Sequence, residues 1–260
     1  MLRTICLSLT LALLFVIPAF ADADYGHIHL TATDKTAAAE WYAKHFNGKT
    51  SGFGGKADAK PDRAVIDGIG ILFFQKKAGF EGSVGSGVDH IGFSMSDVAG
   101  KVKEVEADGG KVLTTGMKFK GMEIAFVVDP WGTKIELIDD PDTRGLHHIH
   151  LNSPDVQGTL EWYANAFGGE ITKFKGMLPA IKYDPLWLIV TKSNKPLAPT
   201  KGRAMDHLGW NFPDLDAAAV ELKSKEVTFS MEPLPYKTIK IAFINGPDGV
   251  NIELVQTPKR

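Results

Sequence analysis

The amino-acid sequence repeats itself over most of its length, and this duplication limits the folds open to the chain more than any other feature. Segment 40–46 (EWYAKHF) recurs 121 residues later as 161–167 (EWYANAF), with five of seven residues identical. Segment 124–137 recurs as 241–254, with eight identities in the same order. Self-similarity of this kind indicates two copies of one structural unit.

The two copies predict two domains, one covering residues 22–140 and the other residues 145–260. Between them, segment 139–145 (DDPDTRG) combines acidic residues, proline and glycine, as turns and short linkers do. Each copy has about 115 to 120 residues, which is enough to build one hydrophobic core.

Hydrophobic periodicity divides each copy into two units of the same order, one strand, one helix and three strands. In the second copy, the first unit is predicted as strand 146–152, helix 158–167 and strands 170–174, 180–183 and 186–191. The second unit is predicted as strand 207–212, helix 214–225 and strands 227–231, 240–244 and 251–255. The fold class that follows is α+β, built from four βαβββ units.

The first 21 residues have the pattern of a secretory signal peptide. Arg3 gives a positive start, residues 5–17 form an apolar run, and residues 19–21 (AFA) match a small-x-small cleavage site. The run of 13 apolar residues is shorter than the roughly 20 that span a bilayer. We therefore expect cleavage after Ala21, a periplasmic or secreted protein, and no stable membrane insertion after cleavage. The single cysteine, Cys6, lies in this segment, so the remaining chain can form no internal disulfide.

The charge pattern bears on the class of partner. The chain has 29 Lys plus Arg against 31 Asp plus Glu, with a formal net charge of -2 and no basic block. Binding to nucleic acid depends on clustered basic side chains that contact phosphates. We therefore expect a small-molecule partner and no nucleic acid.

Strand alternation places histidines and glutamates on polar faces, because every second side chain of a strand points the same way. In strand 146–152, His148 and His150 share one face and apolar residues occupy the other. The polar faces carry the same set in each copy, namely His27, His29, His90 and Glu136 in the first and His148, His150, His207 and Glu253 in the second. Gly92 and Gly209, each two residues beyond a histidine, are expected to leave room there for a ligand.

Two histidines and one glutamate in each copy form a candidate metal site. The predicted groups are His27, His90 and Glu136 in the first copy and His148, His207 and Glu253 in the second. Neutral imidazoles and a carboxylate suit Fe(II), Mn(II), Ni(II), Co(II) or Zn(II). His29 and His150 are candidate catalytic bases beside these groups, substrate contacts, or residues that support the metal ligands. A metal-free hydrogen-bonded His–Glu pair is the alternative.

The unit order and the endings 129–137 (DPWGTKIEL) and 246–254 (GPDGVNIEL) resemble the vicinal oxygen chelate superfamily, which includes glyoxalase I, extradiol dioxygenases and bleomycin resistance proteins. The resemblance covers both copies and implies two tandem domains of that fold. It implies metal ligands at the strand-start histidines and the last-strand glutamates, and a small organic substrate with two neighbouring oxygens. A dioxygenase, a lyase or an isomerase, a small-molecule sequestering protein and a non-catalytic structural module all remain open.

The chain departs from two branches of this superfamily. Relatives of glyoxalase I use a further ligand on the last strand of the first unit, but 71–75 (ILFFQ) and 186–191 (LWLIVT) contain no carboxylate, and Gln75 is the nearest amide. Extradiol dioxygenases carry a tyrosine in the penultimate strand, where this chain has Phe126 and Phe243. The aromatic residues expected to line the polar cups are Phe73, Phe74, Trp131, Tyr183 and Trp187.

Overall fold

The computed structural model describes residues 23–53 and 59–256, so the predicted signal peptide lies outside the described residues. The first unit comprises β1 (Asp24–Ala32), α1 (Lys35–His45), β2 (Lys49–Ser51), β3 (Arg63–Ile66) and β4 (Ile69–Gln75). The second comprises β5 (Val88–Ser94), α2 (Val98–Ala107), β6 (Lys111–Phe119), β7 (Met122–Val128) and β8 (Lys134–Ile138). The third comprises β9 (Gly145–Ser153), α3 (Val156–Phe167), β10 (Glu170–Phe174), β11 (Leu178–Lys182) and β12 (Trp187–Lys192). The fourth comprises β13 (Met205–Asn211), α4 (Leu215–Ser224), β14 (Phe229–Tyr236), β15 (Ile239–Asn245) and β16 (Asn251–Gln256).

The predicted α+β class and the four βαβββ units are confirmed, and the predicted elements differ from the observed ones only at their ends. The same local signal starts every α-helix in the described part of the chain. An aspartate precedes each one, and its side chain accepts hydrogen bonds from backbone N–H groups of the first turn; the four are Asp34, Asp97, Asp155 and Asp214. Each cap is worth about 0.5–2 kcal/mol of helix stability.

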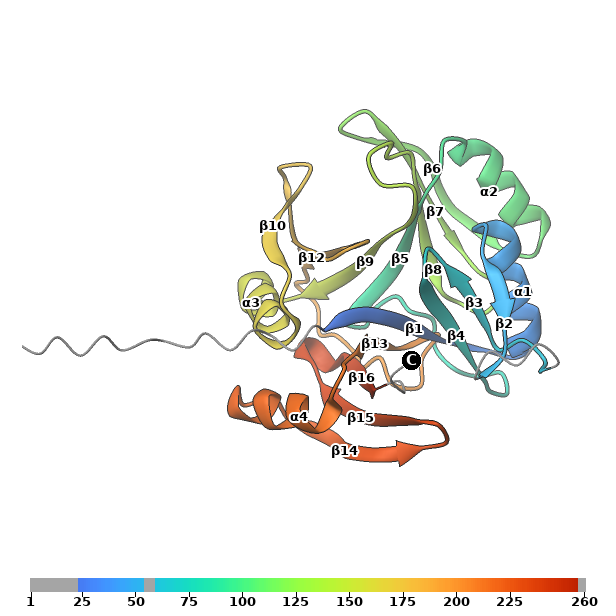
Figure 1. Cartoon of the computed structure of the whole chain (residues 1–260). Helices are drawn as coiled ribbons and strands as arrows, with labels where there is room; N and C mark the ends of the chain where they lie inside the picture. Colours follow the sequence, from blue (N-terminus) through green and yellow to red (C-terminus); the bar gives the residue numbers. More distant parts are fainter. Residues whose placement is uncertain (1–22, 54–58, 257–260) are drawn as a thin grey trace, which may run out of the picture.

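The strands form two eight-stranded sheets, and each sheet joins one unit from each copy (Figure 1). One sheet has the order β14-β15-β16-β13-β1-β4-β3-β2, which joins the fourth unit to the first. The other has the order β10-β11-β12-β9-β5-β8-β7-β6, which joins the third unit to the second. The joins are the antiparallel pairs β1 with β13 and β5 with β9. The two sequence copies are therefore interlocked through their sheets.

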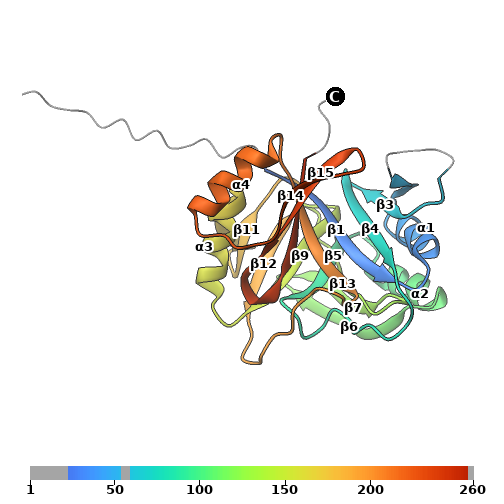
Figure 2. The same ribbon diagram turned by 90° about the horizontal axis from the view of Figure 1, so that it is seen from below.

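Aromatic stacking within the hydrophobic core links the two units of each copy. Helices α1 and α2 lie together on one flank of the molecule, and α3 and α4 lie together on another (Figures 1 and 2). Phe46 at the end of α1 stacks on Phe93 of β5, with ring centroids 3.7 Å apart. The corresponding pair of the second copy, Phe167 and Trp210, stacks at 4.1 Å. Large apolar rings therefore hold each copy together on the helical side of the sheets.

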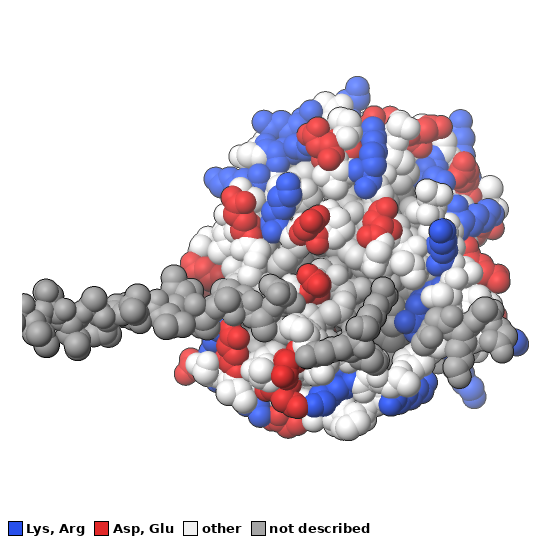
Figure 3. All heavy atoms as spheres, in the orientation of Figure 1, with Lys and Arg blue, Asp and Glu red and all other residues white. Residues whose placement is uncertain are grey.

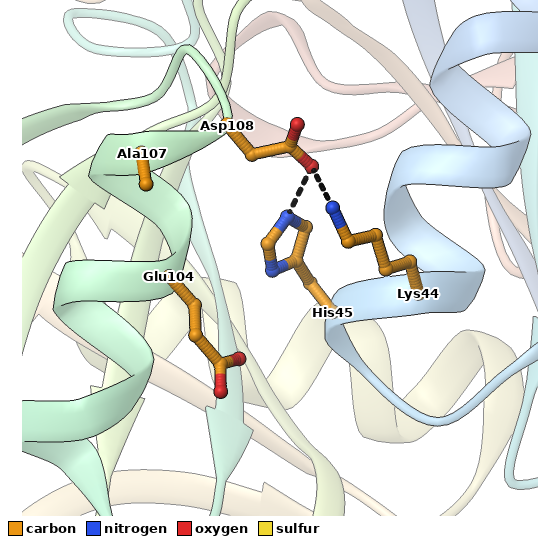
Figure 4. Close-up of a pocket in the computed structure, with 5 residues that line it drawn as sticks. All are labelled: Lys44, His45, Glu104, Ala107 and Asp108. Atoms are coloured by element: carbon orange, nitrogen blue, oxygen red, sulfur yellow. Dashed lines mark hydrogen bonds and ion pairs between the residues drawn. The ribbon is translucent and has the colours of Figure 1, made fainter.

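A hollow of ≈ 270 Å³ lies between α1 and α2, lined by Lys44, His45, Glu104, Ala107 and Asp108 (Figure 4). Lys44 Nζ and His45 Nε2 both contact Asp108 Oδ2, at 2.8 and 2.9 Å. These contacts join the ends of the two helices of the first copy. The hollow shares no residue with the histidine clusters described below.

The surface seen in Figure 3 carries acidic and basic side chains interspersed with uncharged ones. Among the described residues, no helix is both long enough and apolar enough to span a bilayer.

The two copies differ at one buried tyrosine. Tyr42 Oη donates to Asp129 Oδ2 at 2.8 Å, and the other oxygen of this carboxylate accepts from two backbone N–H groups of the following turn. Burial raises the pKa of Asp129 to about 6, which leaves it ionised at neutral pH. In the second copy, Gly246 stands at the position of Asp129, and the buried Tyr163 Oη has no hydrogen-bond partner among the described residues.

This difference predicts opposite sensitivities to the same substitution. We expect Tyr42→Phe to lower the free energy of unfolding by about 1.5–3 kcal/mol, because it removes a hydrogen bond to a buried charged group. Tyr163→Phe should change it by less than about 0.5 kcal/mol or stabilise the protein, because it removes an unpaired hydroxyl. Urea unfolding at neutral pH measures both variants, and equal losses would contradict the assigned contacts.

Candidate functional site

Two clusters of three histidines and one glutamate lie on the faces of the sheets away from the helices. Site 1 comprises His27, His29, His207 and Glu253, and site 2 comprises His90, Glu136, His148 and His150. In each cluster, one potential ligand atom from every residue lies within 4.8 Å of the others. All eight candidate residues taken from strand alternation are therefore brought together, in two groups of four.

The grouping differs from the prediction. We expected each cluster to form within one copy, with His27 beside His90 and Glu136, and that expectation is wrong. The sheets pair β1 with β13 and β5 with β9, so each cluster takes residues from both copies. The second predicted group is corrected in the same way, because His148 lies with site 2 while His207 and Glu253 lie with site 1.

Strand register explains how each cluster forms. In site 1, Gly209 of β13 is in register with Glu253 of β16 on one side and with His27 of β1 on the other. In site 2, Gly92 of β5 is flanked in the same way by Glu136 of β8 and His148 of β9. Each glutamate thus reaches its histidine across an intervening glycine.

The two glycines have a different role from the one expected. A Cβ atom built on Gly209 would collide with the imidazole of His27, and one on Gly92 would collide with that of His148. The space that we expected to admit a ligand therefore holds a histidine ring from the other copy. Any larger residue at either glycine would displace a candidate ligand.

Site 2 is closely packed and buried. His90 Nε2 lies 2.9 Å from Glu136 Oε2 and 3.2 Å from His148 Nε2. The rings of His90 and His150 are 4.4 Å apart between centroids. The Nδ1 atom of His150 is buried and has no hydrogen-bond partner among the described residues.

Site 1 is packed as closely, but its close contact between imidazole nitrogens involves the other first-strand histidine. His207 Nε2 lies 3.2 Å from Glu253 Oε2 and 3.1 Å from His29 Nδ1. His27 Nε2 lies 2.9 Å from the same glutamate oxygen in a geometry that makes no hydrogen bond, and it has no other partner among the described residues. Each site thus has a buried imidazole nitrogen that makes no hydrogen bond to another described residue.

An aspartate that strand alternation did not predict orients one histidine in each site. His90 Nδ1 donates to Asp89 Oδ2, and His207 Nδ1 donates to Asp206 Oδ1, each at 2.7 Å. Both aspartates fall at register shifts of the strand pairs, where a bulge turns an extra side chain out of strict alternation. The repeated Asp-His dipeptide at 89–90 and 206–207 was the sequence signal for them.

These aspartates decide what the sites can bind. Because an ionised carboxylate only accepts, Nδ1 of His90 and His207 carries a proton, and in the neutral ring Nε2 presents a lone pair. Nε2 faces a glutamate oxygen in each site, so this contact needs either a second proton on the ring or a cation. A divalent cation satisfies such a donor set, and two or three imidazoles with one carboxylate are suitable ligands for a first-row metal. The residues therefore fit a bound metal.

Burial and the hydrogen bonds within each site shift the pKa values of the clustered histidines and glutamates. Burial lowers the pKa of His27, His29, His148 and His150, which keeps these rings in the neutral form that binds metal. Burial also acts on His90 and His207, but hydrogen bonds to two carboxylates outweigh it and raise the pKa of both. The pKa of each glutamate is lowered, because the adjacent imidazoles outweigh burial. Both clusters thus hold an ionised carboxylate and attract positive charge.

The sheet position beside the histidines supplies no further carboxylate. Leu72 of β4 is in register with His29, and Ile189 of β12 is in register with His150. Alternation places Gln75 on the opposite face of β4 from these residues, because it pairs with Ala32. The fourth donor of each cluster is therefore His29 or His150.

Some of the expected aromatic residues line the sites. The ring of Phe74 stacks on His29 with centroids 3.6 Å apart, and Trp187 is in register with His148. Phe73 and Tyr183 are buried in the hydrophobic core, and Trp131 packs against that core, so the expectation that they line the cups is wrong. Strand alternation places the adjacent residues Phe73 and Phe74 on opposite faces of the sheet, so it could have excluded Phe73 from the site.

Comparison with known proteins agrees with this architecture. The sequence profile of the Glyoxalase/Bleomycin resistance protein/Dioxygenase superfamily matches residues 24–137 and 145–254. A probable chloroplastic lactoylglutathione lyase of Arabidopsis thaliana is 30% identical over 181 residues, which cover 64% of this chain. The chain spans about half the length of this relative (52%).

Two solved structures share the fold. Glyoxalase I from Zea mays matches with a TM-score of 0.70 at 20% identity, covering 90% of this chain and 92% of the maize chain. A putative dioxygenase from Bacillus subtilis matches with a TM-score of 0.62 at 15% identity, covering 91% of this chain and 86% of the other.

Paired substitutions test the grouping across copies. In metal-stripped protein reconstituted with Zn(II), we expect His27→Ala with Glu253→Ala to remove one equivalent of bound metal, because both residues belong to site 1. His27→Ala with Glu136→Ala should remove both equivalents, although these residues belong to one sequence copy. Metal analysis after desalting gives the stoichiometry.

The reverse outcome, with one equivalent lost from the second pair and two from the first, would restore the grouping within copies. Glu106→Gln, an exposed change on α2, is the matched control and should leave both equivalents bound.

Proposed function

Because the chain belongs to the glyoxalase/bleomycin resistance protein/dioxygenase superfamily, we propose that it is a divalent-metal-dependent lyase that interconverts a 2-hydroxyacyl thioester and the thiol adduct of a 2-oxoaldehyde. The observation that carries the proposal is the convergence of three imidazoles and one carboxylate in each sheet, with one buried imidazole nitrogen in each that makes no hydrogen bond to another described residue. The lactoylglutathione lyase relative supports the reaction class.

The metal would be held by two histidines and the glutamate of each site, that is His27, His207 and Glu253 or His90, His148 and Glu136. When bound, it supplies a Lewis acid that binds two neighbouring substrate oxygens and stabilises negative charge on them. The protein contributes the fixed orientation of the ligands. Asp89 and Asp206 do this by holding the rings of His90 and His207.

His29 and His150 are the proposed bases that move a proton between the two adjacent substrate carbons. In site 2, Thr191 Oγ1 donates its proton to Asn152 Oδ1 and therefore accepts from His150 Nε2. The remaining nitrogen, Nδ1, then presents its lone pair to the cluster. A neutral imidazole within reach of the substrate carbons is suited to general base catalysis.

The residues around the sites disfavour a catechol dioxygenase. Phe243 is in register with Glu253, and its ring lies 5.2 Å from that of His207. Phe126 takes the same place beside His90 at 5.3 Å. The position where an extradiol dioxygenase has a tyrosine therefore lies in each site but has no hydroxyl group.

Apolar side chains beside the metal ligands favour a small substrate with a short carbon skeleton. Leu72 and Phe74 lie on the polar face of β4 in site 1, and Ile189 and Trp187 take the corresponding face of β12 in site 2. Such walls exclude water and leave the oxygens of the substrate to the metal. We also propose that the enzyme acts outside the cytoplasm, as its first 21 residues predict.

Turnover tests the proposal directly. With glutathione and a 2-oxoaldehyde, we expect thioester formation that chelator treatment abolishes and that Zn(II), Co(II), Ni(II), Mn(II) or Fe(II) restores. Because each site has its own glutamate, Glu136→Gln and Glu253→Gln should each retain part of the rate. The double variant should lose on the order of 10³-fold or more, since a metal ligand is changed in both sites.

Glu106→Gln is again the control and should keep the full rate. Tight binding of the thiol adduct without any product would favour a sequestering protein. Oxygen uptake with catechols in place of thioester formation would favour a dioxygenase, and either result would overturn the proposed reaction.

A further inference from the structure

A buried chain of hydrogen bonds stands behind one metal ligand of site 2. His148 Nδ1 lies 2.7 Å from His147 Nδ1, and His147 Nε2 lies 3.2 Å from Asp140 Oδ2. The other oxygen of Asp140 accepts from Lys175 Nζ at 2.8 Å. His147, His148 and Asp140 are each no more than 1% exposed, so solvent does not compete for these contacts.

The direction of this chain is fixed by its carboxylate end. Asp140, paired with Lys175, only accepts, so His147 Nε2 carries a proton and His147 Nδ1 is an acceptor. His148 must then donate from Nδ1, which leaves its Nε2 lone pair facing His90 and Glu136. The chain therefore holds His148 in the tautomer and orientation that a metal requires.

His147 occupies this position because of a bulge. Gly92 pairs with His148 and the next residue, Phe93, pairs with Leu146, so His147 is the extra residue of β9. A bulge turns a side chain out of alternation and increases the local twist. This places the His147 ring beside that of its neighbour, at 5.0 Å between centroids.

Site 1 cannot form the same chain. The residue before His27 at the equivalent bulge of β1 is Gly26. A Cβ atom on Gly26 would lie 2.5 Å from Asn211 Nδ2, so the space taken by His147 in site 2 is filled by Asn211 in site 1. No hydrogen bond from another described residue fixes the tautomer of His27.

The aspartates that orient His90 in site 2 and His207 in site 1 make similar contacts. His90 and His207 each donate to the preceding aspartate at 2.7 Å. Asp89 is further held by Lys134 Nζ at 2.5 Å, and Asp206 by the N–H group of Gly202 at 2.6 Å. The sites thus differ in two supports: His147 stands behind His148 only, and Thr191 Oγ1 contacts His150 in site 2, whereas Phe74 stacks on His29 in site 1.

We propose that the two sites bind a divalent cation unequally, with site 2 the tighter one, and that His147 is the positioning residue responsible. This inference rests on the proposed function, because it requires that both clusters bind metal. Loss of a partner that orients a ligating histidine typically costs 10-fold to 100-fold in metal affinity. We therefore expect site 2 to bind at least about 10-fold more tightly than site 1.

Competition titration of the metal-stripped full chain with Zn(II) and a chromophoric chelator tests the inequality. We expect two equivalents in two affinity classes. Glu136→Ala should remove the tight class, and Glu253→Ala should remove the weak class. Equal affinities, or loss of the tight class in Glu253→Ala, would overturn the inference and leave the proposed function standing; absence of Zn(II) binding would overturn both.

Variants of His147 test its role. His147→Leu should weaken the tight class by about 10-fold to 100-fold and leave the weak class unchanged. His147→Gln should restore part of the affinity, because its amide oxygen can accept from His148 and its amide N–H can donate to Asp140. A merely structural role would weaken both classes together or lower the unfolding midpoint without a site-selective change, and that result would overturn the assignment.

If His147→Leu does not fold, Thr191→Val and the two glutamate variants keep the affinity order measurable. Thr191→Val is expected to leave site 2 the tighter class, because it does not touch the chain behind His148. Reversal of the order in that variant would count against His147 as the cause.

Discussion

Antiparallel pairing of β1 with β13 and of β5 with β9 is the interaction on which the rest of the structure depends. Each copy taken alone would present two four-stranded sheets whose first strands are open edges, and such edges invite pairing with another chain. Joining the copies covers these edges and forms two continuous sheets. The same pairing brings each first-strand histidine pair into register with the histidine and glutamate of the other copy, so the fold and the two sites arise from one set of backbone hydrogen bonds.

The second constraint on the structure is that hydrogen-bond acceptors converge in each histidine cluster. In each cluster, carboxylate oxygens and imidazole lone pairs face one another in buried surroundings, where unpaired polar groups are costly. A cation offsets that cost and at the same time offers positions to a substrate with two neighbouring oxygens. Binding of metal should therefore contribute to the stability of the fold as well as to its chemistry.

The sequence contained most of the architecture and the identity of the clustered residues. Repetition predicted two copies, hydrophobic periodicity predicted two units in each, and alternation placed His27, His29 and Glu253 on polar faces. Alternation reports which face a side chain takes and carries no information on which strand lies beside it, so the grouping across copies could not be read from it. Bulges hid His147 and Asp206 for a related reason, because an extra residue breaks the alternation that the prediction assumes.

The most direct measurement of the central claim is an anomalous-difference map from crystals grown with Zn(II) or Co(II). The account predicts two peaks per chain, one bounded by His27, His207 and Glu253 and the other by His90, His148 and Glu136. Peaks bounded by residues of a single sequence copy, or no peak at either cluster at full metal loading, would contradict it.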